Sequence, residues 1–244
     1  MKTSEPVPLS VGILIIGSLL WDERRQSWRK ARLNMGAMDT VTAPIRYGRL
    51  SSSRGDTYTM VFSRLCKTGQ AKLVHCSHSV STAENLIAEA EHLWKAEQSG
   101  AKAHRIASEW GCVALLGHPK RKPPEILLNA WAKRVAQEPD YGNVSQMADE
   151  GELISPEGML RIDWPRCVAG GAPVDLDLLL VTANDPTLTG TPPSYATVET
   201  IVNAWNSAAQ EHAEYFWKNI DHGITTFQDD EIRAGLRPRQ QERA

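Results

Sequence analysis

Glu97 is an acidic residue at a position where the surrounding pattern favours an apolar one. Apolar side chains recur at helical spacing over residues 81–98, and this stripe consists of Ala83, Leu86, Ala90, Leu93 and Trp94. Continuing the stripe by four residues from Leu93 reaches Glu97, so its carboxylate is expected to lie against the protein interior. Because burial raises the pKa of a carboxylate, this placement suits a general acid–base catalyst near neutral pH. The alternative is a frayed helix end, where Glu97 turns into water or pairs with Lys102 or Arg105.

A second stretch with chemical potential begins at Val11, where an apolar, β-branched run ends abruptly at Gly17 and Ser18. Such a run predicts a buried strand, and glycine followed by serine predicts a tight turn at its end. A turn there presents backbone N–H groups at the edge of a sheet, where they can hold a carboxylate or carbonyl oxygen. Gly17 would also allow a ligand to approach the backbone closely. The alternative is an ordinary core strand followed by a glycine turn.

Other chemical motifs are absent or incomplete. His75, Cys76 and His78 resemble metal ligands, but neighbours on a strand point to opposite faces and no second cluster completes a ligand set. The chain has no G-x-S-x-G nucleophile motif and no Walker-type loop. We therefore expect no metal and no cofactor. Wide spacing argues against a disulfide framework among the four cysteines, which are Cys66, Cys76, Cys112 and Cys167.

The elements that must position these groups alternate between strands and helices, which is typical of an α+β (mixed α/β) fold. β-branched runs predict strands at 12–16, 40–50, 57–62, 71–76, 110–117 and 174–182. Helical spacing predicts helices at 81–98, 123–136 and 196–220, and a short helix within 21–40. Ser51–Asp56 predicts the turn of a hairpin between the second and third strands. Residues 138–160 are polar and typical of a loop.

Bulk composition limits the classes of function. The 244 residues suffice for one large domain, which we place at 11–232, with a flexible tail at 1–10 and a polar tail at 233–244. A net charge of −2 gives no reason to expect a nucleic-acid partner. The apolar run near the start is too short to span a membrane, and no small-residue cleavage site follows it. We therefore expect a cytoplasmic protein with no membrane partner.

Several short motifs, taken in order, resemble the γ-glutamyl cyclotransferase-like superfamily, especially its ChaC-like branch. A strand followed by Gly-Ser-Leu and then a tryptophan is matched here by Ile16–Trp21. Later motifs of the family are matched along the rest of the chain by Ile45–Arg49, Ser52–Thr57, Leu93–Gly100, Pro193-Ser194 and Gly223-Ile224 followed by Asp229.

The resemblance implies a small mixed β-barrel flanked by helices. It also implies cofactor-independent conversion of a γ-glutamyl amine or peptide to 5-oxoproline with release of the amine. Glu97 would be the catalytic acid–base, and the backbone of Gly17, Ser18, Leu19 and Leu20 would bind the small-molecule substrate. The placement of Arg54 in its loop suggests that it pairs with a substrate carboxylate.

The chain departs from the family where Ile16 replaces a tyrosine and where residues 138–170 have no counterpart. These departures leave two alternatives open. One is a catalytically silent ligand- or partner-binding protein on the same fold. The other is a lyase or transferase that acts on a γ-glutamylated natural product. Oligomeric state and substrate identity are not indicated by the sequence.

Overall fold

The computed structural model of the chain describes residues 8–98, 100, 102–141, 146, 147 and 151–237. Its centre is a six-stranded mixed sheet in the order β2-β5-β1-β10-β7-β6. In this sheet β1 and β10 pair in parallel, and all other neighbours are antiparallel. Its strands are β1 (Val11–Ile15), β2 (Leu33–Ala43), β5 (Gly69–Cys76), β6 (Ala107–Ser108), β7 (Gly111–Gly117) and β10 (Leu178–Asn184).

The sheet is open, and the small barrel expected from the resemblance is wrong for the described residues. β2 and the short β6 form the two edges and do not pair with each other. Pro44 ends β2, and the next two strands, β3 (Ile45–Ser51) and β4 (Thr57–Phe62), pair as a separate antiparallel hairpin. The hairpin therefore does not extend the sheet towards closure. The broader prediction of a mixed α+β protein is confirmed.

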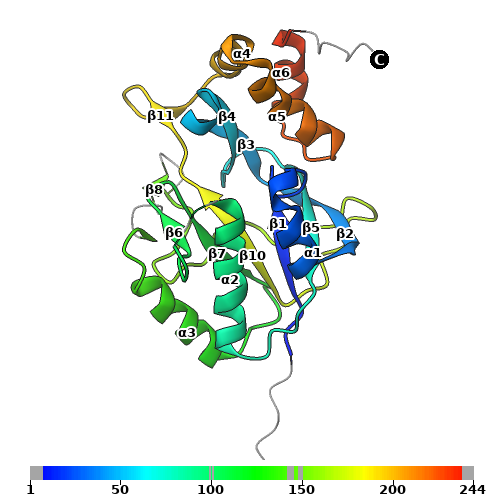
Figure 1. Cartoon of the computed structure of the whole chain (residues 1–244), viewed down its shortest axis with the longest axis vertical. Coiled ribbons are helices and arrows are strands. Elements are labelled where there is room, and N and C mark those ends of the chain that lie inside the picture. The colour runs from blue at the N-terminus through cyan, green and yellow to red at the C-terminus, as the bar shows by residue number, and fades with distance from the viewer. Residues whose placement is uncertain (1–7, 99, 101, 142–145, 148–150, 238–244) are drawn as a thin grey trace, which may run out of the picture.

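Helices cover the sheet and form a separate cluster beyond the hairpin (Figure 1). α2 packs on β7 and β10 and against α3, while α4 and α5 pack on β4. The helices are η1 (Glu23–Arg25), α1 (Gln26–Arg32), η2 (Ser52–Arg54), α2 (Ala83–Glu97), α3 (Glu125–Ala136), α4 (Val198–Ser207), α5 (Gln210–Asp221) and α6 (Asp229–Gly235). Two short strand pairs complete the fold: β8 (Gln146–Met147) with β9 (Gly151–Glu152), and β11 (Leu188–Thr189) with β12 (Ser194–Tyr195). Within the described residues, no helix combines the length and apolar character that crossing a membrane requires.

The helix α2 forms where the apolar stripe predicts it, and its ends explain why. The hydroxyl of Thr82 accepts a hydrogen bond from the Asn85 amide at 3.2 Å, so Thr82 caps a helix that begins at Ala83, two residues after the predicted start at 81. The predicted stripe is buried at Leu86, Ala90, Leu93 and Trp94. Since these side chains pack on the sheet, they fix the direction in which the last turn of α2 presents its residues.

The buried face of α2 also carries an acidic residue, Glu89, which is not part of the predicted apolar stripe. Glu89 is 2% exposed, and its carboxylate forms an ion pair with the guanidinium of Arg32 at the end of α1. A second hydrogen bond joins Arg32 Nε to Glu89 Oε2 at 3.2 Å. The pair fastens α1 to α2. The pocket described below takes Glu97 from α2 and Arg24 and Arg25 from η1, which directly precedes α1.

Replacing Arg32 by methionine should lower the free energy of unfolding by about 3 kcal/mol, because it leaves a buried carboxylate without its partner. The matched control is Arg161→Met, which breaks the exposed ion pair with Glu152. That control should lower the free energy of unfolding by less than about 0.5 kcal/mol. Urea denaturation measures both values. A loss in Arg32→Met as small as that expected for the control would show that the Arg32 pair contributes little to stability.

The single helix predicted over 196–220 is wrong, because the structure has two helices with a break at Ala208. Ala208 has an extended ψ of 160°, which ends α4 and redirects the chain. The break lets both helices pack an aromatic ring on Tyr47 of β3: Trp205 at 4.7 Å and Phe216 at 6.0 Å between ring centroids. Burial of these rings outweighs the local preference for one continuous helix.

Other boundaries also differ from the sequence predictions. β2 begins at Leu33 rather than near residue 40, since it pairs with β5 across an irregular register. The predicted tail at 1–10 is anchored at its end, where the Leu9 amide donates to Val80 O at 2.8 Å; residues 1–7 lie outside the described part. The predicted tail at 233–244 begins inside α6, and residues 238–244 are also outside the described part.

Candidate active site

A pocket of about 900 Å³ lies where the sheet, the hairpin and the C-terminal helices meet. The parallel strands β1 and β10 both point their carboxyl ends into it, through Gly17 after β1 and Thr182 and Asn184 at the end of β10. In open sheets, ligands commonly bind at the carboxyl ends of parallel strands. η1, the β3–β4 hairpin, the end of α2 and α5 supply the remaining walls.

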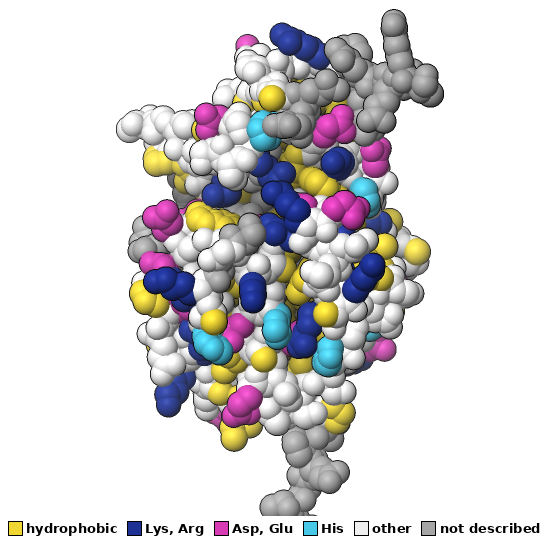
Figure 2. All heavy atoms as spheres, in the orientation of Figure 1, with side chains coloured by type: hydrophobic (Ala, Val, Ile, Leu, Met, Phe, Trp, Pro, Cys, Tyr) yellow, Lys and Arg dark blue, Asp and Glu magenta, His cyan; other side chains and the backbone are white. Residues whose placement is uncertain are grey.

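The pocket is positively charged, although the whole chain has a net charge of −2. Its charged lining consists of five basic residues (Arg24, Arg25, Arg49, Arg54, Lys218) and three acidic ones (Asp22, Glu23, Glu97). Figure 2 shows Lys and Arg side chains gathered across the middle of this face, between the helical end and the sheet. The excess of positive charge favours an anionic ligand.

The turn after β1 is held by backbone hydrogen bonds within itself. The Leu20 amide donates to Gly17 O at 3.1 Å, and the Asp22 amide donates to Ser18 O at 2.8 Å. The amides of Ser18 and Leu19 donate to no acceptor among the described residues, so they are available to a ligand oxygen. Gly17, Ser18 and Leu19 line the pocket, whereas Leu20 is buried in the core and does not line it.

Tyr215 of α5 lies directly against this turn. A methyl group on Gly17 would lie 2.7 Å from the Tyr215 hydroxyl oxygen, so only glycine fits here without displacement. The indole of Trp21 contacts the same tyrosine at 5.7 Å between centroids, and its Nε1 donates to Asn219 Oδ1 at 2.8 Å. The turn and α5 therefore form one wall of the pocket.

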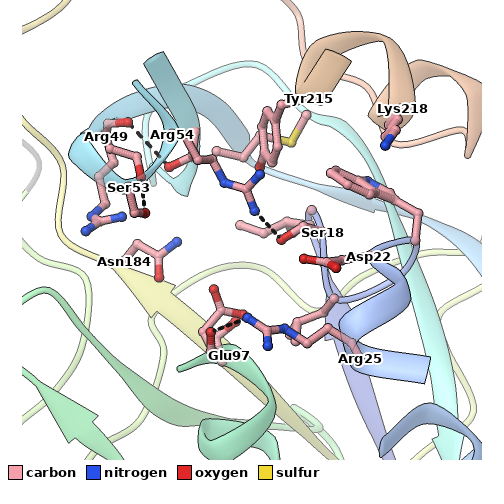
Figure 3. Close-up of a pocket in the computed structure, with 18 of the residues that line it drawn as sticks. Ser18, Asp22, Arg25, Arg49, Ser53, Arg54, Glu97, Asn184, Tyr215 and Lys218 are labelled. Atoms are coloured by element: carbon pink, nitrogen blue, oxygen red, sulfur yellow. Dashed lines mark hydrogen bonds between the residues drawn. The ribbon is translucent and has the colours of Figure 1, made fainter. Parts of the chain in front are cut away.

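Glu97, the last residue of α2, lines the same pocket and is only partly exposed (Figure 3). Burial raises the pKa of its carboxyl group, while the guanidiniums of Arg25, Arg54 and Arg49 act in the opposite direction. Arg25 Nη2 also donates to the backbone oxygen of Glu97 at 3.0 Å, which fastens the helix end. A carboxylate with a raised pKa beside a cavity is suited to accept a proton and to return it.

The frayed-end alternative is not what the structure shows among the described residues. Arg105, which was a possible partner of Glu97, instead binds the carboxylates of Glu138 and Asp140. The Gln98 amide donates to Trp94 O at 2.8 Å, so the last turn of α2 is closed. Glu97 is held at the pocket wall by this closed turn and by Arg25.

Arg54 extends into the pocket from the hairpin loop. Its Nη2 donates to Ser18 Oγ at 3.0 Å, and its guanidinium lies 4.8 Å from the ring centroid of Tyr215. The loop is fixed because Thr57 Oγ1 donates to Arg54 O at 2.8 Å and because Gly55 adopts a φ of +60°. No carboxylate of the described residues forms an ion pair with Arg54. A planar cation held in this way can bind a carboxylate through two hydrogen bonds.

The sequence pattern does not identify several residues that line the pocket. Tyr215 and Lys218 belong to the predicted amphipathic helix of 196–220, and Arg49 belongs to a predicted strand. Their side chains reach the pocket only because α5 and the hairpin pack over the end of the sheet. Arg24 and Arg25, which also line the pocket, come from the segment 21–40, for which the sequence predicts only a short helix.

Glu97, Gly17, Ser18, Leu19 and Arg54 thus meet in one pocket, although Gly17 and Glu97 are about eighty residues apart in the sequence. No protein-family model matches the chain, and neither a curated protein nor a solved structure matches it, so the chemistry of this pocket is judged from its own residues.

Proposed function

We propose that the protein is a γ-glutamyl cyclotransferase-like enzyme, which converts a γ-glutamyl amine or peptide to 5-oxoproline and the free amine. The observation that carries the proposal is the meeting of three unlike groups in one pocket: the carboxylate of Glu97, the free amides of Ser18 and Leu19, and the guanidinium of Arg54. A γ-glutamyl group presents a matching set, namely an α-ammonium, a carbonyl oxygen and an α-carboxylate.

In the proposed mechanism, Glu97 takes one proton from the α-ammonium of the substrate. The resulting amine attacks the γ-carbonyl carbon of the same molecule, so ring closure benefits from proximity. The new C–N bond closes the five-membered ring, and the Ser18 and Leu19 amides hold the negative oxygen of the tetrahedral intermediate.

The intermediate collapses when the bond to the leaving nitrogen breaks and Glu97 returns its proton to that nitrogen. The ring nitrogen loses a second proton, which the released amine takes up. The amine therefore leaves as an ammonium ion that carries the proton from Glu97 and the proton from the ring nitrogen, and Glu97 ends the cycle as a carboxylate. One carboxylate with a raised pKa can serve both steps.

The direct test is to incubate the purified protein with a panel of γ-glutamyl amines, amino acids and peptides and to identify products by mass spectrometry. We expect 5-oxoproline and free amine from at least one member.

Ile16 lines the pocket and adds no hydroxyl there, which favours the alternative of a silent binding protein. That alternative predicts binding without turnover, and such a result across the panel would reject the enzymatic proposal.

Replacing Gly17 by alanine should lower kcat/KM for 5-oxoproline release about 10- to 100-fold, because the new methyl group displaces either the turn or Tyr215. The control is Gly36→Ala, at an exposed position whose nearest neighbour, Asn34 Oδ1, would lie 3.5 Å from the added carbon. Steady-state kinetics on both variants measures the effect. Unchanged kinetics for Gly17→Ala would show that the turn does not contact the reacting group.

A further inference from the structure

The cations of the pocket differ in how far their charge is already compensated. Arg24 is neutralised by Asp22, to which it donates with both Nε and Nη2. Arg25 donates to the backbone oxygen of Glu97, and Lys218 is exposed at the rim. Arg54 and Arg49 form no ion pair with any carboxylate of the described residues. Arg54 is assigned above to the α-carboxylate of the substrate, which leaves Arg49 without a role.

Arg49 is partly buried at the pocket wall. Its guanidinium is 4.7 Å from the ring centroid of Trp110, and burial lowers the pKa of the arginine. The carboxylates of Glu97 and Asp185 raise the pKa of Arg49, but neither is in ion-pair contact with it among the described residues. Burial also raises the pKa of Asp185 to about 6, so Asp185 compensates the arginine only weakly in mildly acidic conditions. Partial burial of a cation without a paired anion has a cost, which a ligand that supplies the anion removes.

The place of Arg49 in the pocket is distinct from that of Arg54. Figure 3 shows Arg49, Ser53 and Asn184 on one side and Ser18 and Asp22 on the other, with Arg54 and Glu97 between them. Ser53 and Asn184 both line the pocket on this side. The side of Arg49 therefore offers a second set of polar groups beyond those that the γ-glutamyl group would use.

We propose that Arg49, lying on Trp110, binds a carboxylate on the leaving amine and so selects γ-glutamyl amino acids and peptides over γ-glutamyl derivatives of neutral amines. The inference rests on the proposed function. Each substrate charge then has one partner: the α-ammonium faces Glu97, the α-carboxylate faces Arg54, and the second carboxylate faces Arg49. A neutral leaving amine would leave the partly buried Arg49 without a paired anion.

The test compares γ-glutamylglycine with γ-glutamylglycinamide, which differ in one carboxylate and little in size. We expect the wild-type protein to favour γ-glutamylglycine by about 30-fold in kcat/KM, since a charge-assisted pair is lost with the amide. Arg49→Met should reduce this preference to within about 3-fold. Arg121→Met removes the same charge from an arginine that pairs with Asp175 outside the pocket, and it should leave the preference unchanged.

The outcomes separate this inference from the proposed function. Equal turnover of the two compounds by the wild-type protein, or an unchanged preference in Arg49→Met, overturns the inference and leaves the cyclotransferase proposal intact. Absence of turnover for both compounds removes support from the proposed function, and calorimetric binding then decides the role of Arg49. Binding of γ-glutamylglycine about tenfold tighter than the glycinamide, lost in Arg49→Met, would support the subsite, and equal binding would reject it.

Discussion

Replacing Glu97 by glutamine is expected to lower kcat for 5-oxoproline release by about 10³-fold. Glutamine has nearly the same shape and can keep the contacts of the helix end, but it cannot accept a proton from the α-ammonium. Substrate affinity should fall much less than kcat, because Arg54 and the Ser18 and Leu19 amides remain in place. Steady-state kinetics with a direct assay for 5-oxoproline measures both parameters.

The pH dependence of kcat/KM is a second test of the role of Glu97. Glu97 must be ionised to act as a base, so kcat/KM should fall as pH decreases through its pKa. Because burial raises that pKa, the fall should begin at a higher pH than for an ordinary glutamate. Glu84→Gln, on the exposed face of the same helix, is the control and should retain wild-type kinetics. Wild-type activity in Glu97→Gln would exclude this residue as the acid–base catalyst.

Replacing Arg54 by methionine is expected to raise KM for γ-glutamyl substrates about 30- to 100-fold, which corresponds to about 2–3 kcal/mol of lost binding energy. Methionine retains much of the packing on Tyr215 but removes the charge and the hydrogen bond to Ser18 Oγ. Because the α-carboxylate is bound equally in the ground state and the transition state, kcat should fall much less than affinity.

Arg54→Lys provides the matched comparison, because it keeps the charge and loses the planar pair of donors. It should recover only part of the lost affinity. A fall in kcat without a change in KM would contradict this assignment. It would place Arg54 at the oxyanion rather than at the α-carboxylate.

Much of the local structure can be predicted from the chain, because it depends on neighbours in sequence. The run after Val11 forms β1, the stripe of residues 81–98 forms α2, and Ser51–Asp56 joins the two strands of a hairpin. Each of these depends on side-chain periodicity or on turn-forming residues within a few positions. The position of Glu97 on the buried side of its helix was predicted for the same reason.

Non-local packing decided the features that the sequence predictions missed. The break at Ala208 exists because Trp205 and Phe216 both pack on Tyr47, which lies far away in the chain. The open sheet results from β3 and β4 pairing with each other rather than with an edge of the sheet. Neither effect has a periodic signature, since both are set by competition between tertiary contacts.

Local residue patterns suffice to predict a strand that ends in a glycine turn and a helix that ends in an inward-facing carboxylate. Contacts between distant segments are needed to bring these two ends, together with Arg54 and Arg49, into the same pocket. The physical reason is that local patterns determine which way a side chain points along its own element. The packing of α2 on β7 and β10, and of α5 on β4, then determines which elements meet.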